Sequence, residues 1–336
     1  MNPSPSPLAS PAPEPRTGRP PSVAVVVPCY NEEVAIGDVI ADFRRSLPDA
    51  DIFIYDNNSS DRTVEIARAA GAHVRTETRQ GKGNVVRRMF ADVDADVIVM
   101  VDGDKTYDAS SAPALIDRLV ADNLDMVVGT RLQSDAEAAF RSGHRFGNVL
   151  LTMAVNRLFR ARLVDILSGY RVMSRRFAKS FPALSTGFET ETELTIHALE
   201  LRSPMAEVET PYKTRPEGSE SKLNTWADGF RILLTILKLV REFRPVLFYG
   251  TLAVLFGAVS LVLAAPVVAT YMETGLVPRL PTAVLATSVM LLAFLSTTAG
   301  LVLESVSRGR WEQKRMAYLA LPSVRTATGA DSDSAM

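Results

Sequence analysis

The sequence predicts an α/β domain with a mostly parallel β-sheet, followed by two membrane-spanning helices. Three observations lead to this fold class. Short β-branched runs alternate with segments of helical periodicity between residues 22 and 222, polar clusters follow the strand-like runs, and two long apolar runs in the last third carry almost no charge. A parallel sheet is buried on both faces, so its strands are expected to be apolar throughout.

The expected elements follow one another in strand and helix order. Strands are predicted at Ser22–Val27, Asp51–Tyr55, His73–Arg75, Val97–Val101 and Met126–Val128. Helices are predicted at Glu32–Ser46, Asp61–Ala70, Val85–Ala91 and Ala112–Ala121. The second helix is followed by Gly71, the residue type that favours the left-handed conformation just after a helix. This order is typical of a mostly parallel sheet with helices on both faces.

Polar residues gather after four of the predicted strands. The clusters are Pro28–Glu33, Asp56–Asp61, Asp102–Asp108 and Gly129–Arg131. Ligands of open α/β sheets bind at the carboxyl ends of the strands, so we expect the functional site there. The run Asp102-Gly103-Asp104 places two carboxylates directly after an apolar strand, and such carboxylates require a cation or a hydrogen-bond donor.

The composition excludes several classes of protein. The chain has 336 residues, is 47% hydrophobic and has a formal net charge of −1, which excludes a wholly disordered chain and gives no signal for nucleic-acid binding. Its single cysteine, Cys29, permits no internal disulfide, and with three scattered histidines it cannot make a structural zinc site. A reducing, cytosolic setting suits this composition.

The usual nucleotide-binding loops are absent from the sequence. The first strand is followed by PCYNEE in place of a Gly-x-Gly-x-x-Gly turn, and no Walker-type loop occurs. The pair Gly81-Lys82-Gly83 is too short a match to either motif. A bound nucleotide would therefore be held by side chains and a metal.

Two apolar runs, Val246–Thr270 and Pro281–Leu303, are each long enough to cross about 30 Å of hydrocarbon as a helix. We expect two transmembrane helices, with a pair of buried helices in a soluble core as the alternative. The loop between the runs holds only Glu273 and Arg279, whereas basic residues lie outside them. These are Lys238, Arg241 and Arg244 before the first run and Arg308, Arg310, Lys314 and Arg315 after the second. Both termini and the α/β domain are therefore expected to be cytoplasmic.

We expect five segments along the chain. They are a disordered Pro-rich tail (1–21), the α/β domain (22–222), an amphipathic juxtamembrane helix (223–244), a two-helix membrane anchor (245–304) and a polar cytoplasmic tail (305–336). The juxtamembrane segment alternates Trp226 and Leu237 with Arg231, Lys238 and Arg241. This pattern is typical of a helix on the membrane surface, and a helix packed on the α/β domain would have a similar one.

A set of short motifs carries a family resemblance. In chain order they are VVVPCYNEE, DNNSSDRT, GKGNVVRRMF, DGD, GTR, LSGYRVMSR and RPEGSESKLN. Together, over Val23 to Asp228, they resemble the family 2 glycosyltransferases of GT-A fold, and within these the polyprenyl-phosphate glycosyltransferases of the dolichol-phosphate mannose synthase type. The two C-terminal spans resemble the membrane-anchored branch of that group. The QxxRW signature of processive polysaccharide synthases does not occur in this sequence.

The resemblance implies a metal site at the DGD motif. Asp102 and Asp104 would hold Mg²⁺ or Mn²⁺, which bridges the diphosphate of a nucleotide-sugar, because hard cations prefer oxygen ligands. Some relatives have a glutamine two positions after the second aspartate as a further metal contact, whereas this chain has Thr106. The alternative is that Asp104 only caps a turn or helix before Ser110.

The resemblance also implies donor and sugar contacts. The donor-binding residues would be Pro28, Tyr30, Glu32, Asp56, Lys82 and Asp102, and the catalytic residues Asp104, Arg131, Glu189, Glu191 and Asp165. Asp56-Asn57 replaces the family's paired aspartates, and Asn57, Asn58 and Ser59 could serve only as turn formers. Residues 189 and 191 do not share a helix face, so one of the two glutamates is expected to point inward. Solvated charges are the alternative for Lys82, Arg131 and both glutamates.

The acceptor implied by the resemblance is a lipid phosphate. Its oxygen is ionised near neutral pH, so no strong general base is required. Arg215, Ser219, Ser221 and Lys222 in RPEGSESK form a candidate site for this phosphate, with a charged linker as the alternative.

The predicted function is an inverting transfer of a sugar from a UDP- or GDP-hexose to polyprenyl phosphate at the cytoplasmic membrane face. One rival is an enzyme of the same fold that acts on another membrane glycolipid or a polysaccharide. The other rival is a catalytically silent membrane scaffold. The expected partners are the donor, the lipid acceptor and the bilayer, with no nucleic acid; homo-oligomers are compatible with the sequence, but no motif fixes their number.

Overall fold

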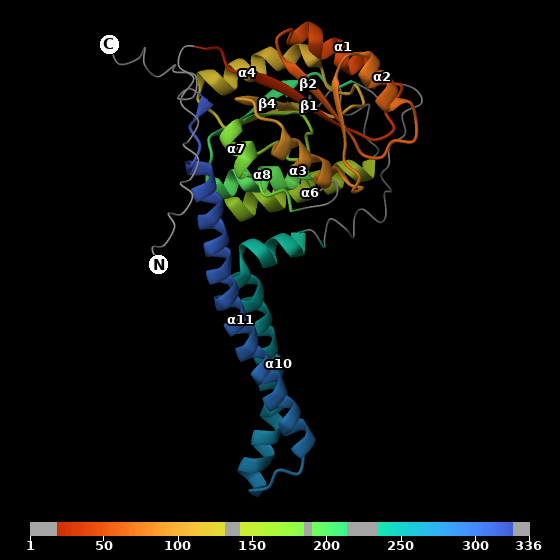
Figure 1. Cartoon of the computed structure of the whole chain (residues 1–336). Helices are drawn as coiled ribbons and strands as arrows, with labels where there is room; N and C mark the ends of the chain where they lie inside the picture. Colours follow the sequence, from red (N-terminus) through yellow and green to blue (C-terminus); the bar gives the residue numbers. More distant parts are fainter. Residues whose placement is uncertain (1–18, 132–141, 185–189, 214–233, 235, 325–336) are drawn as a thin grey trace, which may run out of the picture. The chain divides into compact units, whose positions relative to one another are not determined.

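The computed structural model describes residues 19–131, 142–184, 190–213, 234 and 236–324 (Figure 1). The chain divides into two compact units. Of the described residues, 19–131, 165–184, 190–213 and 317–324 belong to the sheet unit, and 142–164, 234 and 236–316 belong to the helical unit.

The sheet unit contains a seven-stranded sheet with the order β3-β2-β1-β4-β6-β5-β7. The strands are β1 (Val23–Cys29), β2 (Asp51–Asp56), β3 (His73–Thr76), β4 (Val97–Met100), β5 (Met126–Arg131), β6 (Arg171–Ser174) and β7 (Met205–Thr210). Strand β6 runs antiparallel to its neighbours β4 and β5, and the other pairs are parallel. The prediction of a mostly parallel sheet is confirmed. Strand β5 runs three residues past its predicted end, so Gly129–Arg131 belongs to the strand.

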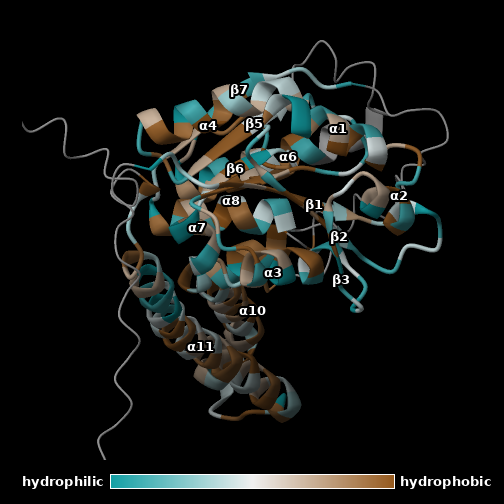
Figure 2. Ribbon diagram, turned by 45° about the horizontal axis from the view of Figure 1, so that its top comes forward, coloured by the Kyte–Doolittle hydropathy of each residue, from teal (hydrophilic) through white to brown (hydrophobic). Residues whose placement is uncertain are grey.

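Helices cover both faces of this sheet, as the alternating pattern predicts. The helices of the sheet unit are α1 (Ile36–Ser46), α2 (Thr63–Ala69), α3 (Lys82–Asp92), α4 (Ala112–Ala121), α7 (Arg175–Ser180) and α8 (Thr190–Leu201). Val25 and Val27 of β1 pack in one apolar cluster with α1, α2 and α4. Ala24 and Val26 pack in a second cluster with α3, α7 and α8. The two-residue period of the strand therefore divides its side chains between two cores. Figure 2 shows α1 and α4 on one side of the sheet and α3 and α7 on the other.

Local hydrogen bonds explain why two helices begin later than predicted. The amide of Ile36 donates to the Glu32 carbonyl (2.9 Å), so residues 32–35 form a turn before α1. Asp61 accepts a hydrogen bond from the amide of Thr63 (3.0 Å), the first residue of α2, and therefore lies in the turn before this helix. Gly71 follows α2 with φ +76°, as expected for a glycine at a helix C-terminus.

The helical unit contains α6 (Ser142–Phe159), α10 (Pro245–Thr274) and most of α11 (Leu280–Leu319). Helices α10 and α11 are long and apolar enough to cross a membrane, and only 6% and 17% of their most apolar stretches are buried. Helices in a soluble core would be mostly buried, so this exposure favours membrane association. The two helices are in contact: the Ser260 hydroxyl of α10 donates a hydrogen bond to the Ala286 carbonyl of α11 (2.7 Å). Helix α11 continues to Leu319, past the predicted end of the second span at Leu303.

Candidate active site

Four acidic side chains gather at the carboxyl ends of β1, β2 and β4. The thiol of Cys29, the last residue of β1, lies among them. Burial raises the pKa of this thiol, and the neighbouring charges of Glu32, Asp56, Asp102 and Asp104 raise it further. The carboxylates that the sequence places after three different strands are therefore neighbours in the fold, at the edge where ligands of α/β sheets bind.

The DGD turn after β4 packs tightly against β1. A Cβ atom added to Gly103 would lie 2.9 Å from the Cys29 Sγ, so a larger residue between the two aspartates would displace the thiol. Asp104 is buried, and its Oδ1 accepts hydrogen bonds from the hydroxyl (2.6 Å) and the amide (3.2 Å) of Thr106. Asp104 thus closes a turn with the residue that stands where some relatives have a metal-binding glutamine.

Lys82 joins two of the predicted site residues. It is the first residue of α3, and its Nζ lies 2.5 Å from the Asp102 Oδ1 and also contacts the Glu191 carboxylate. Burial lowers the pKa of the Lys82 ammonium, but Asp102 and Glu191 outweigh burial and raise it. Lys82 is therefore a largely buried ammonium beside the DGD motif, and its two carboxylate partners favour its charged form. Glu191 points inward, whereas Glu189 lies outside the described residues.

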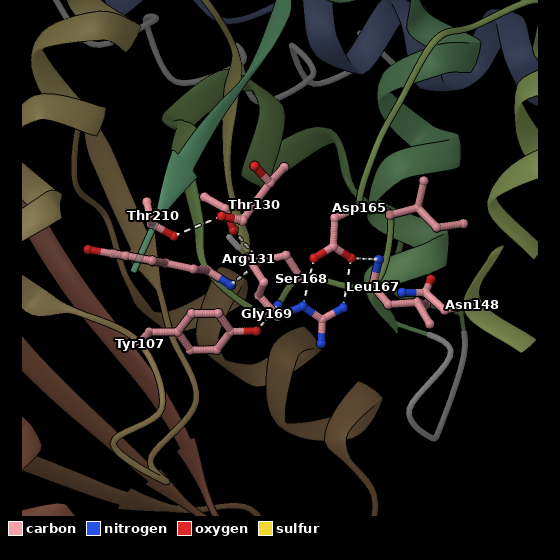
Figure 3. A network of polar contacts seen from close by, with 12 residues as sticks. Tyr107, Thr130, Arg131, Asn148, Asp165, Leu167, Ser168, Gly169 and Thr210 are labelled. Carbon is pink, nitrogen blue, oxygen red and sulfur yellow. Dashed lines mark hydrogen bonds and ion pairs between the residues drawn. The ribbon is translucent and has the colours of Figure 1, made fainter. Parts of the chain in front are cut away.

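Arg131 and Asp165 form a second charged pair at this edge (Figure 3). Two parallel hydrogen bonds of 2.7 Å join the guanidinium to the carboxylate, and both side chains are largely buried. Burial raises the pKa of Asp165, but the hydrogen bonds and charge of Arg131 outweigh it and hold this pKa below its ordinary range. The guanidinium also lies over the ring of Tyr212, with its carbon 5.6 Å from the ring centre.

The loop before β6 touches the DGD motif. A Cβ atom added to Gly169 would lie 2.3 Å from the Asp102 Oδ2, so a larger residue at this position would displace the Asp102 carboxylate. The Gly169 amide donates to the Tyr107 hydroxyl (2.8 Å), a contact visible in Figure 3. The sequence did not indicate a role for Tyr107. Its only distinguishing feature there is that it is an aromatic residue three positions after the DGD motif.

Arg171 is a further residue that sequence reasoning did not assign. It is fully buried and donates to the carbonyls of Ser168 (3.0 Å) and Ile166 (2.8 Å) and to the Thr195 hydroxyl (2.9 Å). It thereby braces the loop that carries Asp165 and Gly169. The motif LSGYR contained it, but its burial could not be read from the sequence.

The donor-side residues lie at the ends of β1 and β2. Pro28 pairs in register with Tyr55, Tyr30 is exposed, and the Glu32 amide donates to the Thr63 hydroxyl (2.8 Å). Asp56 is buried and its Oδ1 accepts from the amide of Ser59 (3.2 Å).

Asn57 ties this edge to the loop that leads into α3. Its side chain donates to the carbonyls of Glu77 (2.9 Å) and Arg79 (2.8 Å) and accepts from the amide of Gly81 (2.7 Å). These bonds to the backbone favour the interpretation of Asn57 as a turn-forming residue. They also position Lys82 at the start of α3. The predicted acceptor residues Arg215, Ser219, Ser221 and Lys222 lie outside the described residues.

The site's oxygen ligands fit a divalent cation only in part. Among the described residues no group of three or more His, Cys, Asp or Glu side chains is arranged to enclose a metal. Asp102 and Asp104 can still supply carboxylate oxygens from a single turn, and the Asp102 side chain is 30% exposed. Mg²⁺ commonly binds through one or two carboxylates and completes its shell with water and substrate phosphates. Two aspartates at an open sheet edge match that mode.

Comparison with known proteins agrees with this fold. Residues 24–181 match the model of glycosyl transferase family 2. Glycosyltransferase AglJ of Haloferax volcanii is 33% identical over 246 residues, which cover 73% of this chain and 80% of AglJ. A dolichyl-phosphate hexose transferase of the same organism is 34% identical over 223 residues, 66% of this chain and 95% of that protein.

Solved structures show the same fold. Glucosyl-3-phosphoglycerate synthase from Mycobacterium tuberculosis, in complex with Mn²⁺, UDP and glucosyl-3-phosphoglycerate, has a TM-score of 0.53 and 23% identity; the match covers 66% of this chain and 79% of that one. The sheet unit therefore has the GT-A fold. The chain belongs to glycosyltransferase family 2.

Proposed function

We propose that this protein transfers a sugar, with inversion, from a UDP- or GDP-sugar to polyprenyl phosphate at the cytoplasmic face of a membrane. The observation that carries the proposal is the acidic edge around Asp102 with the buried ammonium of Lys82, in a chain that also has two apolar helices of membrane-spanning length. The similarity to a dolichyl-phosphate hexose transferase supports a lipid-phosphate acceptor.

Asp102 and Asp104 are the residues that would hold Mg²⁺ or Mn²⁺. The cation would neutralise the diphosphate that leaves with the nucleoside. On the protein's side, Lys82 supplies a fixed positive charge beside Asp102, where the donor's phosphates would bind. Pro28, Tyr30, Glu32 and Asp56 would line the nucleoside at the ends of β1 and β2, and Arg131 with Asp165 would border the sugar.

The acceptor chemistry requires orientation more than proton removal. A lipid phosphate is already ionised near pH 7, so its oxygen can attack the anomeric carbon directly from the face opposite the leaving diphosphate. Glu191 forms an ion pair with Lys82. This pairing fits the proposed transfer, because the reaction does not need the Glu191 carboxylate as a base. We assign Glu189 to the sugar side, and Arg215, Ser219, Ser221 and Lys222 to the acceptor phosphate.

The proposed organisation follows the five segments of the sequence. Residues 22–222 are the catalytic domain, 223–244 the juxtamembrane helix and 245–304 the anchor, with residues 1–21 and 305–336 on the cytoplasmic side. The excess of Lys and Arg outside the two spans supports this orientation.

The test is transfer of label to a short polyprenyl phosphate by the purified full-length protein. A panel of UDP- and GDP-sugars is supplied with Mg²⁺ or Mn²⁺, and parallel reactions contain EDTA. A labelled lipid whose formation EDTA abolishes is the expected product. If the folded protein leaves every donor untransferred, the lipid-phosphate acceptor is wrong, and transfer to a membrane glycolipid or polysaccharide, or donor binding without turnover, replaces it.

A further inference from the structure

Thr106 is a buried residue beside the DGD motif, and the proposed reaction leaves it without a role. Its hydroxyl donates to the Asp104 Oδ1 (2.6 Å), and its amide donates to the same oxygen (3.2 Å). Both side chains are almost fully buried. Because two donors on one oxygen restrict rotation of the carboxylate, Thr106 fixes the direction in which Asp104 points.

The turn that makes these two bonds is strained. Lys105, between the two residues, has φ +60°, a left-handed conformation that residues other than glycine rarely adopt. The Lys105 side chain forms an ion pair with Asp38 of α1 and takes no part in the turn itself. Backbone strain of this kind persists where the surrounding structure enforces it, and it is concentrated at functional sites. A constraint on the orientation of Asp104 would account for it.

The same arrangement at Asp61 serves a different purpose. The Asp61 Oδ1 accepts from the hydroxyl (2.5 Å) and the amide (3.0 Å) of Thr63, again two residues later. Thr63 is the first residue of α2, so that turn leads directly into a helix. The helical turn after the DGD motif begins only at Ala109, three residues beyond Thr106. The bonds at Asp104 therefore require an explanation other than the start of a helix.

Thr106 is itself held by the end of β7. Its carbonyl accepts from the amide of Lys213 (2.8 Å), and the next residue, Tyr107, pairs with Tyr212 in an antiparallel β-bridge. The rings of Tyr107 and Tyr212 also pack with their centres 5.3 Å apart. Thr106 therefore lies between the Asp104 carboxylate and a second backbone segment that holds it in place.

We propose that Thr106 is a positioning residue, whose hydroxyl orients the Asp104 carboxylate for the divalent cation without binding the cation itself. Hydrogen-bond partners of metal ligands fix the orientation of these ligands, and their loss typically weakens metal binding or activity by about 10–100-fold. The inference rests on the proposed function, because it requires Asp104 to be a metal ligand. It is independent of which sugar or acceptor the enzyme uses.

Binding of Mn²⁺ to the purified full-length protein tests this role. The electron paramagnetic resonance signal of free Mn²⁺ is measured over a concentration series, with and without UDP or GDP, and blanks without protein are subtracted. Thr106→Val removes the hydroxyl at nearly constant size, whereas Thr106→Ser keeps it. Thr106→Ala also lacks the hydroxyl and is measured in parallel, and thermal unfolding identifies the variants that keep the fold. Thr63→Val removes the equivalent bond at Asp61 and is the matched control.

The expected result is a Mn²⁺ dissociation constant that rises about 10–100-fold in Thr106→Val and Thr106→Ala, and by less than about twofold in Thr106→Ser and Thr63→Val.

Thr106→Cys separates positioning from direct binding. A cysteine in the coordination shell would favour the soft cation Cd²⁺ over Mn²⁺. Displacement of bound Mn²⁺ by Cd²⁺ measures this preference. If Thr106 acts only through Asp104, the preference of Thr106→Cys stays equal to that of the wild type, which contains the same Cys29.

Wild-type Mn²⁺ affinity in the folded Thr106→Val or Thr106→Ala variant would overturn the positioning role and leave Asp104 as a metal ligand. An equal loss in Thr63→Val, a loss in Thr106→Ser, or a raised preference of Thr106→Cys for Cd²⁺ would overturn it too. Absence of Mn²⁺ binding by the wild type, with and without nucleotide, would contradict the metal site of the proposed function and this inference with it. The two failures are therefore distinguishable.

Discussion

The Lys82 ammonium lies 2.5 Å from the Asp102 Oδ1 and also contacts the Glu191 carboxylate. Lys82 begins α3, Asp102 follows β4 and Glu191 lies in the first turn of α8, so a single buried cation links three elements at the carboxyl edge of the sheet. Without this cation, two carboxylates would face each other in a poorly solvated site.

Lys82→Met should therefore be strongly destabilising. Removal of one partner from a buried charge cluster costs about 3–5 kcal/mol, because the remaining charges are left uncompensated. Urea unfolding of the variant and of Lys82→Met/Glu191→Gln measures this effect. The double variant removes one of the two orphaned carboxylates and should recover part of the loss; equal stability of the single and double variants would contradict the pairing.

The pair Arg131–Asp165 predicts a pH dependence of stability. The pKa of Asp165 is lower in the folded state than its ordinary value of about 3.9, so its contribution is fully present above that pH and is lost as the pH falls through the folded pKa. Asp165→Asn should cost about 3 kcal/mol at pH 7. The gap between wild type and variant should narrow below about pH 4. A constant gap from pH 7 to pH 3 would argue against the pair.

Gly169→Ala tests the close approach of the loop before β6 to the DGD motif. The new Cβ would lie 2.3 Å from the Asp102 Oδ2, so the carboxylate must move. We expect a loss of transfer of about tenfold or more, as small displacements at an active site produce large rate effects. Gly309→Ala is the control, since an added Cβ there meets nothing within 4 Å. Equal rates for the two variants would show that Asp102 tolerates displacement.

Tyr318→Phe tests a buried hydrogen bond within the sheet unit. The Tyr318 hydroxyl donates to the Asp125 Oδ2 (2.6 Å), and its ring lies 4.7 Å from the Arg176 guanidinium carbon. Asp125 keeps its bonds from Arg176 and Ser174 in the variant, so the expected loss is about 1–2 kcal/mol. Thermal unfolding measures it, with Tyr271→Phe on the exposed surface of α10 as a control. No difference between the variants would mean that the buried bond contributes nothing.

Much of the fold can be predicted from the sequence because it depends on local periodicity. The apolar strands β1, β2 and β4 and the helices between them follow from patterns of two and 3.6 residues, and the clustering of Asp56, Asp102 and Asp104 follows from parallel strands sharing one carboxyl edge. Strands β6 and β7 were not predicted: β6 is a four-residue strand after a polar turn, and β7 has charged residues along it.

The remaining features depend on contacts between distant parts of the chain. Tyr318 and Asp125 are 193 residues apart in sequence. Tyr318 lies in a segment, residues 305–336, that was predicted to be a polar tail. The burial of Arg171 and the choice of Lys82 as the partner of Glu191 also depend on tertiary packing, which periodicity does not encode. The sequence therefore predicts candidate site residues, whereas the structure shows how those that it describes pair.

The most direct test of the central claim compares metal-dependent sugar transfer by the wild type and by Asp104→Asn, with Asp117→Asn as the matched control at an exposed position. The variant keeps the size of the side chain and removes its charge. We predict that wild type and Asp117→Asn form the glycosylated lipid only with Mg²⁺ or Mn²⁺, and that Asp104→Asn loses at least 99% of the rate (about 100-fold) while its unfolding temperature changes little. A wild-type rate in Asp104→Asn would contradict the assignment of the DGD motif as the metal site.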